Sequence, residues 1–247
     1  MDMGELKDAM KEGWRRAKQQ AAVKVFNLKV SSDVELDSQY ERLLQLESQM
    51  HSIKAALEAH IAALVELLWS GEQLSQKLSD YSCEPGSTTA EPARQGSRVW
   101  RELQRGATRA LEQQMTAKCL QPVSDYLGEI EGIKKLHAER TRRMMDYDYY
   151  RRKVSELNAK PQRDQAKLQR NSEKLSSTEM AFAGATAELK VRLAALLLER
   201  WDFINAPQLH LIDFQHNFFS NLASAMQPLS VFTSDSMLLD AEARCAA

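Results

Sequence analysis

A heptad pattern in the last third of the chain limits what this sequence can fold into. A seven-residue interval returns a side chain to nearly the same face of an α-helix after two turns, so apolar residues at that interval predict a long helix packed along a coiled-coil seam. With only 9 Gly and 6 Pro in 247 residues there are few places for turns, and no stretch alternates long enough to predict a β-strand. The heptad residues are Leu168, Leu175, Phe182, Leu189, Leu196 and Phe203.

Two further segments carry apolar residues at helical spacing. The first follows an N-cap signal at 31–33 and should run to about residue 80, and the second should run from 94–99 to about residue 157. Turn-forming residues separate the three segments. The sequence therefore predicts an all-α fold of three long helices in an antiparallel coiled coil. The apolar face of the first helix should comprise Leu36, Tyr40, Leu43, Met50, Leu57, Ile61, Leu64, Leu68, Leu74, Leu78 and Tyr81.

The long helices should be bent, and they should pair with a second copy of the chain. Pro122 lies inside the second helix and Pro207 inside the third, and proline lacks the backbone N–H that a helix interior needs. Consecutive apolar residues at 67–69 and 196–198 make these segments apolar on more than one face. A thin three-helix bundle has little interior to cover a second face, so we expect a homodimer.

Residues 1–30 form a separate amphipathic segment. They carry seven Lys and Arg against four Asp and Glu, arranged around a thin apolar face. A weakly apolar helix with basic flanks is typical of helices that lie in a membrane interface, and an ordinary helix packed on the main body is the alternative. The candidate membrane-inserting residues are Leu6, Met10, Trp14, Ala17, Ala21 and Val25.

Charge is sorted along the chain. Residues 134–174 contain 13 Lys and Arg against 6 Asp and Glu, residues 32–93 contain 3 against 11, and the formal net charge of the whole chain is −1. A positive stretch on a stiff helix needs an anionic surface as its partner. The acidic first helix and the nearly neutral total argue against nucleic acid as that partner.

No constellation of catalytic residues appears, so we expect neither enzymatic activity nor a cofactor. The sequence has no Gly-rich phosphate loop, no His-Glu-x-x-His motif and no nucleophile elbow. His210, Asp213 and His216 stand three apart, but the further ligands that a metal site needs are not evident. Three cysteines without metal or redox spacing, no signal peptide and no apolar run of bilayer length indicate a cytoplasmic protein that would meet a membrane from one side.

The run Arg-Arg-Met-Met-Asp-Tyr-Asp-Tyr-Tyr-Arg-Arg-Lys at 142–153 resembles the basic run and Asp-Tyr-Asp that BAR domains carry on their second helix. The residues at 125–128 and 158–160 resemble the same family, and 33–84 is similar to its acidic first helix. The resemblance covers about 1–227 and is to the amphiphysin type, called N-BAR, which has an N-terminal amphipathic helix. The chain departs from amphiphysin at its turn, where proline and glutamine replace part of a lysine run.

This resemblance implies a crescent-shaped dimer of kinked three-helix coiled coils. It implies an N-terminal amphipathic helix at 1–30, a BAR domain at 31–227 and a short tail at 228–247. The implied function is binding to anionic phospholipid membranes and sensing or generating curvature, as in tubulation and endocytosis. The alternative is a coiled-coil cytoskeletal or tethering adaptor that does not bind lipid. The candidate lipid contacts are Lys134, Lys135, Arg140, Arg142 and Arg143 on the concave face, and Lys160, Arg163 and Lys167 at the tip.

Overall fold

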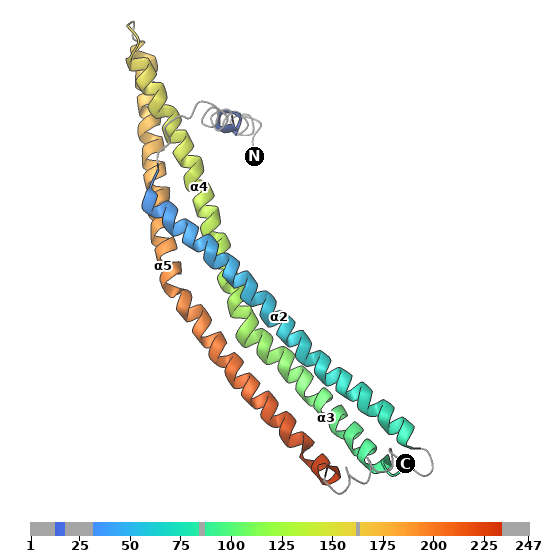
Figure 1. Ribbon diagram of the computed structural model, residues 1–247. Coiled ribbons are helices and arrows are strands. Elements are labelled where there is room, and N and C mark those ends of the chain that lie inside the picture. The colour runs from blue at the N-terminus through green and yellow to red at the C-terminus, as the bar shows by residue number, and fades with distance from the viewer. Residues whose placement is uncertain (1–12, 18–31, 84–86, 162–163, 234–247) are drawn as a thin grey trace. The chain divides into compact units, whose positions relative to one another are not determined.

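The protein folds into long helices, which confirms the predicted all-α class (Figure 1). The computed structural model describes residues 13–17, 32–83, 87–161 and 164–233, and every regular element within these ranges is helical. A short helical stretch at 13–17 precedes the three long helices, and the second of these is built from three consecutive elements. The elements are α2 (Val34–Ser82), α3 (Ala90–Met115), the π-helical turn η1 (Thr116–Leu120), α4 (Gln121–Asn158), α5 (Gln165–Met226) and the 3-10 helix η2 (Gln227–Phe232).

The chain divides into two compact units. Unit 1 comprises Met1–Ser48 and Leu127–Arg200, and unit 2 comprises Gln49–Tyr126 and Trp201–Ala247. The helices α2, α4 and α5 each contribute residues to both units.

In unit 1, α4 packs against both α2 and α5 through aromatic pairs. Tyr40 of α2 stacks on His137 of α4 with 3.7 Å between ring centroids. Tyr147 of α4 stacks on Phe182 of α5 at 5.7 Å, so a residue of the predicted heptad faces α4. The buried apolar residues of this unit include Leu36, Leu43, Ile130, Ile133, Leu189 and Leu193.

Aspartates mark the starts of α2 and α5. The carboxylate of Asp33 accepts a hydrogen bond from the backbone N–H of Leu36 at 3.2 Å, and that of Asp164 accepts one from the N–H of Lys167 at 3.0 Å. Asp33 also pairs with Lys190 of α5 at 2.7 Å. These carboxylates satisfy N–H groups that have no partner within the helix.

In unit 2, α2 goes on burying one face, but its apolar residues leave that face after Leu68. The predicted apolar residues Leu74, Leu78 and Tyr81 are exposed, and the serines next to them at 75, 79 and 82 are buried instead. The prediction was wrong here because the six-residue step from Leu68 to Leu74 does not return to the same helix face. The buried face meets α3, where the ring of Trp100 lies against Gly71.

The helices are irregular near the two prolines. In η1 the backbone N–H of Gln121 donates to the carbonyl of Thr116, five residues back, immediately before Pro122. Pro207 stays inside the continuous helix α5, and its carbonyl accepts a hydrogen bond from the thiol of Cys119 at 3.6 Å. A π turn and an internal proline are both recognised causes of helix bending.

Candidate functional site

The basic residues at 134–174 are here called the cationic arm. Those that the structure describes lie on α4 and α5 of unit 1, except Lys160, which follows the end of α4. The ammonium group of Lys134 lies 2.6 Å from a carboxylate oxygen of Glu131 and 2.8 Å from one of Glu47. These hydrogen bonds, that to Glu131 first, raise the pKa of Lys134 well above its ordinary value. Lys134 is thus held by two carboxylates, whereas the neighbouring Lys135 is exposed.

Arg140 does not lie at the surface. The residue is only 3% exposed, and its guanidinium carbon lies 5.5 Å from the centroid of the Phe182 ring. Its nearest carboxylate contact is Asp37 at 4.0 Å. We therefore remove Arg140 from the predicted lipid contacts, because a buried guanidinium cannot reach a headgroup without unpacking α4 from α5.

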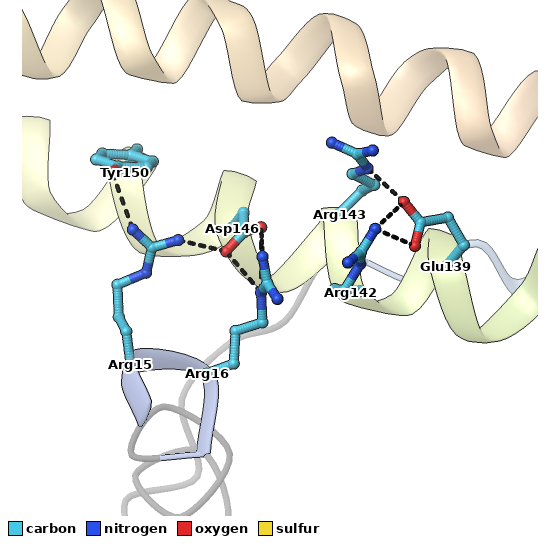
Figure 2. Close-up of polar contacts among 7 residues, drawn as sticks. All are labelled: Arg15, Arg16, Glu139, Arg142, Arg143, Asp146 and Tyr150. Carbon is cyan, nitrogen blue, oxygen red and sulfur yellow. Dashed lines mark hydrogen bonds and ion pairs between the residues drawn. The ribbon is translucent and has the colours of Figure 1, made fainter. Parts of the chain in front are cut away.

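Arg142 and Arg143 are exposed and share one carboxylate (Figure 2). Arg142 Nη2 lies 2.5 Å and Arg143 Nε 2.6 Å from Glu139. The hydrogen bond from Arg142, together with the weaker effect of the bond from Arg143, outweighs the opposing effect of burial and holds the pKa of Glu139 below its usual range. Both guanidinium groups are thus exposed next to each other on α4.

The basic residues that follow the Asp-Tyr-Asp motif pair within α4. Arg151 contacts Asp148 at 3.0 Å, and Lys153 contacts Glu156 at 3.6 Å. Tyr147 packs on α5, as described above, and the Arg151 guanidinium lies 5.5 Å from its ring centroid. The motif therefore serves helix packing rather than acid–base chemistry.

The predicted tip lies at the turn between α4 and α5. Lys160 follows the end of α4, Lys167 lies in the first turn of α5, and both are exposed. Arg163 lies outside the described residues.

Of the predicted membrane-inserting residues, Trp14 and Ala17 belong to the helical stretch at 13–17, and both are exposed. Leu6, Met10, Ala21 and Val25 lie outside the described residues. The stretch contacts α4, because Arg15 and Arg16 both bind Asp146. Sequence reasoning missed this contact; its only trace is the pair of aspartates within a basic run.

A second candidate surface lies in unit 2 and is apolar. A groove of about 660 Å³ opens beside α3 and α5, and its lining includes Val99, Phe214 and Phe218. Two helices of the same unit also expose large apolar side chains, which are Leu67, Leu74, Leu78 and Tyr81 on α2, and Trp201, Leu209, Ile212 and Phe219 on α5.

The described ranges contain neither a metal site nor a membrane span. No cluster of three or more His, Cys, Asp or Glu side chains is placed there to hold a metal ion, and this includes His210, Asp213 and His216. No described helix combines the length and the apolar character that crossing a bilayer requires.

Comparison with known proteins identifies the fold. Amphiphysin from Gallus gallus is 22% identical over 214 residues, which are 83% of this chain but only 28% of that protein, so the chain spans less than a third of it. Protein hob3 from Schizosaccharomyces pombe is 20% identical over 208 residues, covering 84% of this chain and 78% of that protein.

Two solved structures share the fold at low sequence identity. The amphiphysin BAR domain from Drosophila matches with a TM-score of 0.65 at 18% identity, covering 86% of this chain and 99% of that one. A BAR protein from Galdieria sulphuraria matches with a TM-score of 0.60 at 19% identity, covering 82% and 98%. The model of the BAR domain family matches residues 10–231. The chain therefore belongs to the BAR-domain family, whose members are membrane-binding adaptors rather than enzymes, dimerise, and generally sense or generate membrane curvature.

Proposed function

We propose that this protein binds anionic phospholipid membranes as a homodimer and senses or generates their curvature, as a peripheral protein on the cytoplasmic face. The observation that carries the proposal is the exposed positive charge of the cationic arm in a chain of this family. The proposed lipid contacts are Lys135, Arg142, Arg143, Lys160 and Lys167, which are exposed. Arg163, outside the described residues, is a further proposed contact, and Lys134 becomes one when lipid phosphates replace Glu47 and Glu131.

The charge is sufficient for membrane binding. Each Lys or Arg near an anionic surface contributes about 1 kcal/mol, and the contribution decays within a Debye length. Five exposed cations on each of two protomers give a gross attraction on the order of 10 kcal/mol. Binding should therefore be strong in low salt and should fall steeply as salt is raised.

The proposal assigns different tasks to the parts of the chain. Residues 31–227 form the membrane-binding body, residues 1–30 insert as an amphipathic helix, and 228–247 are a tail. The exposed indole of Trp14 supports insertion, because tryptophan favours the membrane–water interface.

Dimerisation is assigned to unit 2. Its groove and its exposed apolar residues on α2 and α5 form a surface that water solvates poorly. Exposed apolar surface of this kind marks protein–protein contacts, and the family is dimeric. The partner that fits is a second copy, because the same apolar helices would then cover one another.

Vesicle sedimentation tests the proposal. The protein should pellet with vesicles of phosphatidylcholine and phosphatidylserine, should ignore pure phosphatidylcholine, and should be released by salt. The double variant Arg142→Gln/Arg143→Gln should lose about 2 kcal/mol per protomer, hence about 4 kcal/mol per dimer, or roughly 1,000-fold in affinity. The charge-matched control Arg105→Gln/Arg109→Gln removes two exposed arginines from α3 instead, and it should bind far more tightly than the arm variant.

The same experiment examines the adaptor alternative. A lipid-independent adaptor would bind neither kind of vesicle, or would bind both equally at every salt concentration. Equal weakening by the two double variants would show that total charge, and not the cationic arm, governs binding.

A further inference from the structure

The helical stretch at 13–17 is bound to α4 through two adjacent arginines. Arg15 Nη2 donates to Asp146 Oδ1 at 2.6 Å, and Arg15 Nη1 donates to the hydroxyl of Tyr150 at 2.9 Å. Arg16 binds the same carboxylate with two nitrogens, Nε at 3.2 Å from Oδ1 and Nη2 at 3.0 Å from Oδ2. Figure 2 shows the two guanidinium groups converging on one aspartate.

Aromatic rings complete the site that receives Arg15. Its guanidinium carbon lies 5.0 Å from the centroid of Tyr149 and 5.2 Å from that of Tyr150, within the range of cation–π attraction. The two tyrosine rings meet edge to face, 5.1 Å apart. With the arginines in place, the Asp146 side chain is only 12% exposed. A carboxylate and two rings thus form a guanidinium-binding site on α4.

Several cations gather at this site. Arg15 and Arg16 both bind Asp146, and a further cation, Lys174, lies 5.8 Å from the centroid of the Tyr150 ring. The Nε atom of Arg15 is buried, and no hydrogen-bond partner for it is found in the part of the chain that the structure describes. A phosphate group is anionic, as the Asp146 carboxylate is, and can bind a guanidinium with two oxygens. Phosphate can therefore compete with Asp146 for these arginines.

Asp146 lies on the same helical face as two of the proposed lipid contacts. Lys135, Arg142 and Asp146 are separated by seven and by four positions, which keeps them on one side of α4. A segment bound to Asp146 is therefore close to the surface of α4 that faces the membrane in the proposed function.

We infer that Asp146, Tyr149 and Tyr150 form a docking site for the chain's own N-terminal segment, and that phosphates of an anionic membrane displace this segment by binding Arg15 and Arg16. The displacement rests on the proposed function, whereas the docking does not. In solution the segment stays on α4. At the membrane, the two arginines exchange a shared carboxylate for lipid phosphates, and Trp14 enters the interface beside them.

Cleavage by trypsin after Arg15 and Arg16 measures the docking, because the protease must bind the arginine side chain itself. Asp146→Asn keeps the side-chain shape and removes the charge. We expect it to speed cleavage at these two sites by roughly 5–30-fold, the effect of losing a charged hydrogen-bond partner.

Glu139→Gln is the matched control. It also removes one acidic charge from α4, and it takes away the carboxylate shared by Arg142 and Arg143, but its side chain does not contact 13–17 in the structure. Cleavage after Arg15 and Arg16 should stay at the wild-type rate. Equal rates in the wild type and Asp146→Asn would overturn the docking.

A second variant tests the docking without changing any residue of α4. Arg16→Gln leaves α4 unaltered and should speed cleavage after Arg15. An unchanged rate in this variant, with an unchanged thermal unfolding curve, would equally overturn the docking.

Vesicle binding tests the displacement separately. Glu173 on α5 gives the matched control for vesicle binding, because its carboxylate accepts a hydrogen bond from Gln169 rather than from a proposed lipid contact. Asp146→Asn and Glu173→Gln add the same net charge, but only the first removes the competing docked state. Its affinity for phosphatidylserine vesicles should exceed that of Glu173→Gln by up to the factor seen in cleavage. Equal affinities would overturn the displacement. If no variant distinguishes phosphatidylserine from phosphatidylcholine, the proposed function fails, and the cleavage rates still decide the docking.

Discussion

At the scale of single residues, the tightest packing is at Gly71 in unit 2, where the residue has no side chain. A Cβ atom added to Gly71 would lie 2.3 Å from an atom of the Trp100 ring, closer than such atoms approach in real proteins. The glycine therefore lets α3 place a large aromatic ring directly on the backbone of α2. The buried serines that follow on α2 continue this face of small residues.

Gly71→Ala should destabilise the protein. Alanine favours the helix by up to about 1 kcal/mol, but the displaced ring costs about 1–3 kcal/mol, so we expect a net loss of roughly 1 kcal/mol. Urea unfolding measures the change. The control is Gly106→Ala on α3, where an added Cβ would meet nothing within 4 Å and should stabilise the helix. A Gly71 variant as stable as the control would contradict the close packing.

At the scale of helices, Asp33 combines two roles at the start of α2. Its hydrogen bond with Lys190, and then its bond from the N–H of Leu36, lower the pKa of this carboxyl below its ordinary 3.8. Because the pKa is lowered on folding, the stabilisation is complete above the ordinary value and is lost as the pH falls through the folded value.

Asp33→Ala should therefore cost about 1–2 kcal/mol at neutral pH, mostly through the lost cap. The difference from the wild type should shrink toward pH 2, where the wild-type carboxyl is protonated. Urea unfolding at both pH values measures this. Asp33→Asn retains an oxygen that can cap α2. Its free energy of unfolding at neutral pH should therefore lie between those of the wild type and Asp33→Ala. A cost for Asp33→Ala that is independent of pH would show that the charge contributes nothing.

How far the sequence predicts this structure depends on the range of the interactions. The starts of α2 and α5 were predictable, because Asp33 and the 158–164 turn are local signals. The exposure of Leu74 and Leu78 could have been predicted too, because the six-residue step from Leu68 to Leu74 leaves the buried face. The contacts of Arg15 and Arg16 with Asp146 join residues 130 positions apart and leave no periodic pattern. The burial of Arg140 inside a basic run was hidden for the same reason.

At the scale of the whole molecule, the exposed apolar residues argue for association. Most large apolar side chains exposed among the described residues belong to unit 2. Over residues 74–82 of that unit, α2 buries serines and exposes leucines, an arrangement that is unfavourable in a monomer and favourable once a partner covers the leucines.

Leu78→Lys should therefore separate the protomers. Leu78 is 53% exposed in the single chain, and burying a leucine is worth about 1.5–3 kcal/mol. Each dimer loses two such leucines, one from each protomer, so the dimer dissociation constant should rise by roughly 100-fold or more. Analytical ultracentrifugation measures it. The matched control is Leu44→Lys, on the same helix but in unit 1 and 40% exposed, which should remain dimeric. Membrane affinity should fall with the dimer, because a monomer presents half the charge. If Leu78→Lys sediments as the wild type does, unit 2 does not form the dimer contact around this residue, and its exposed leucines must have another partner.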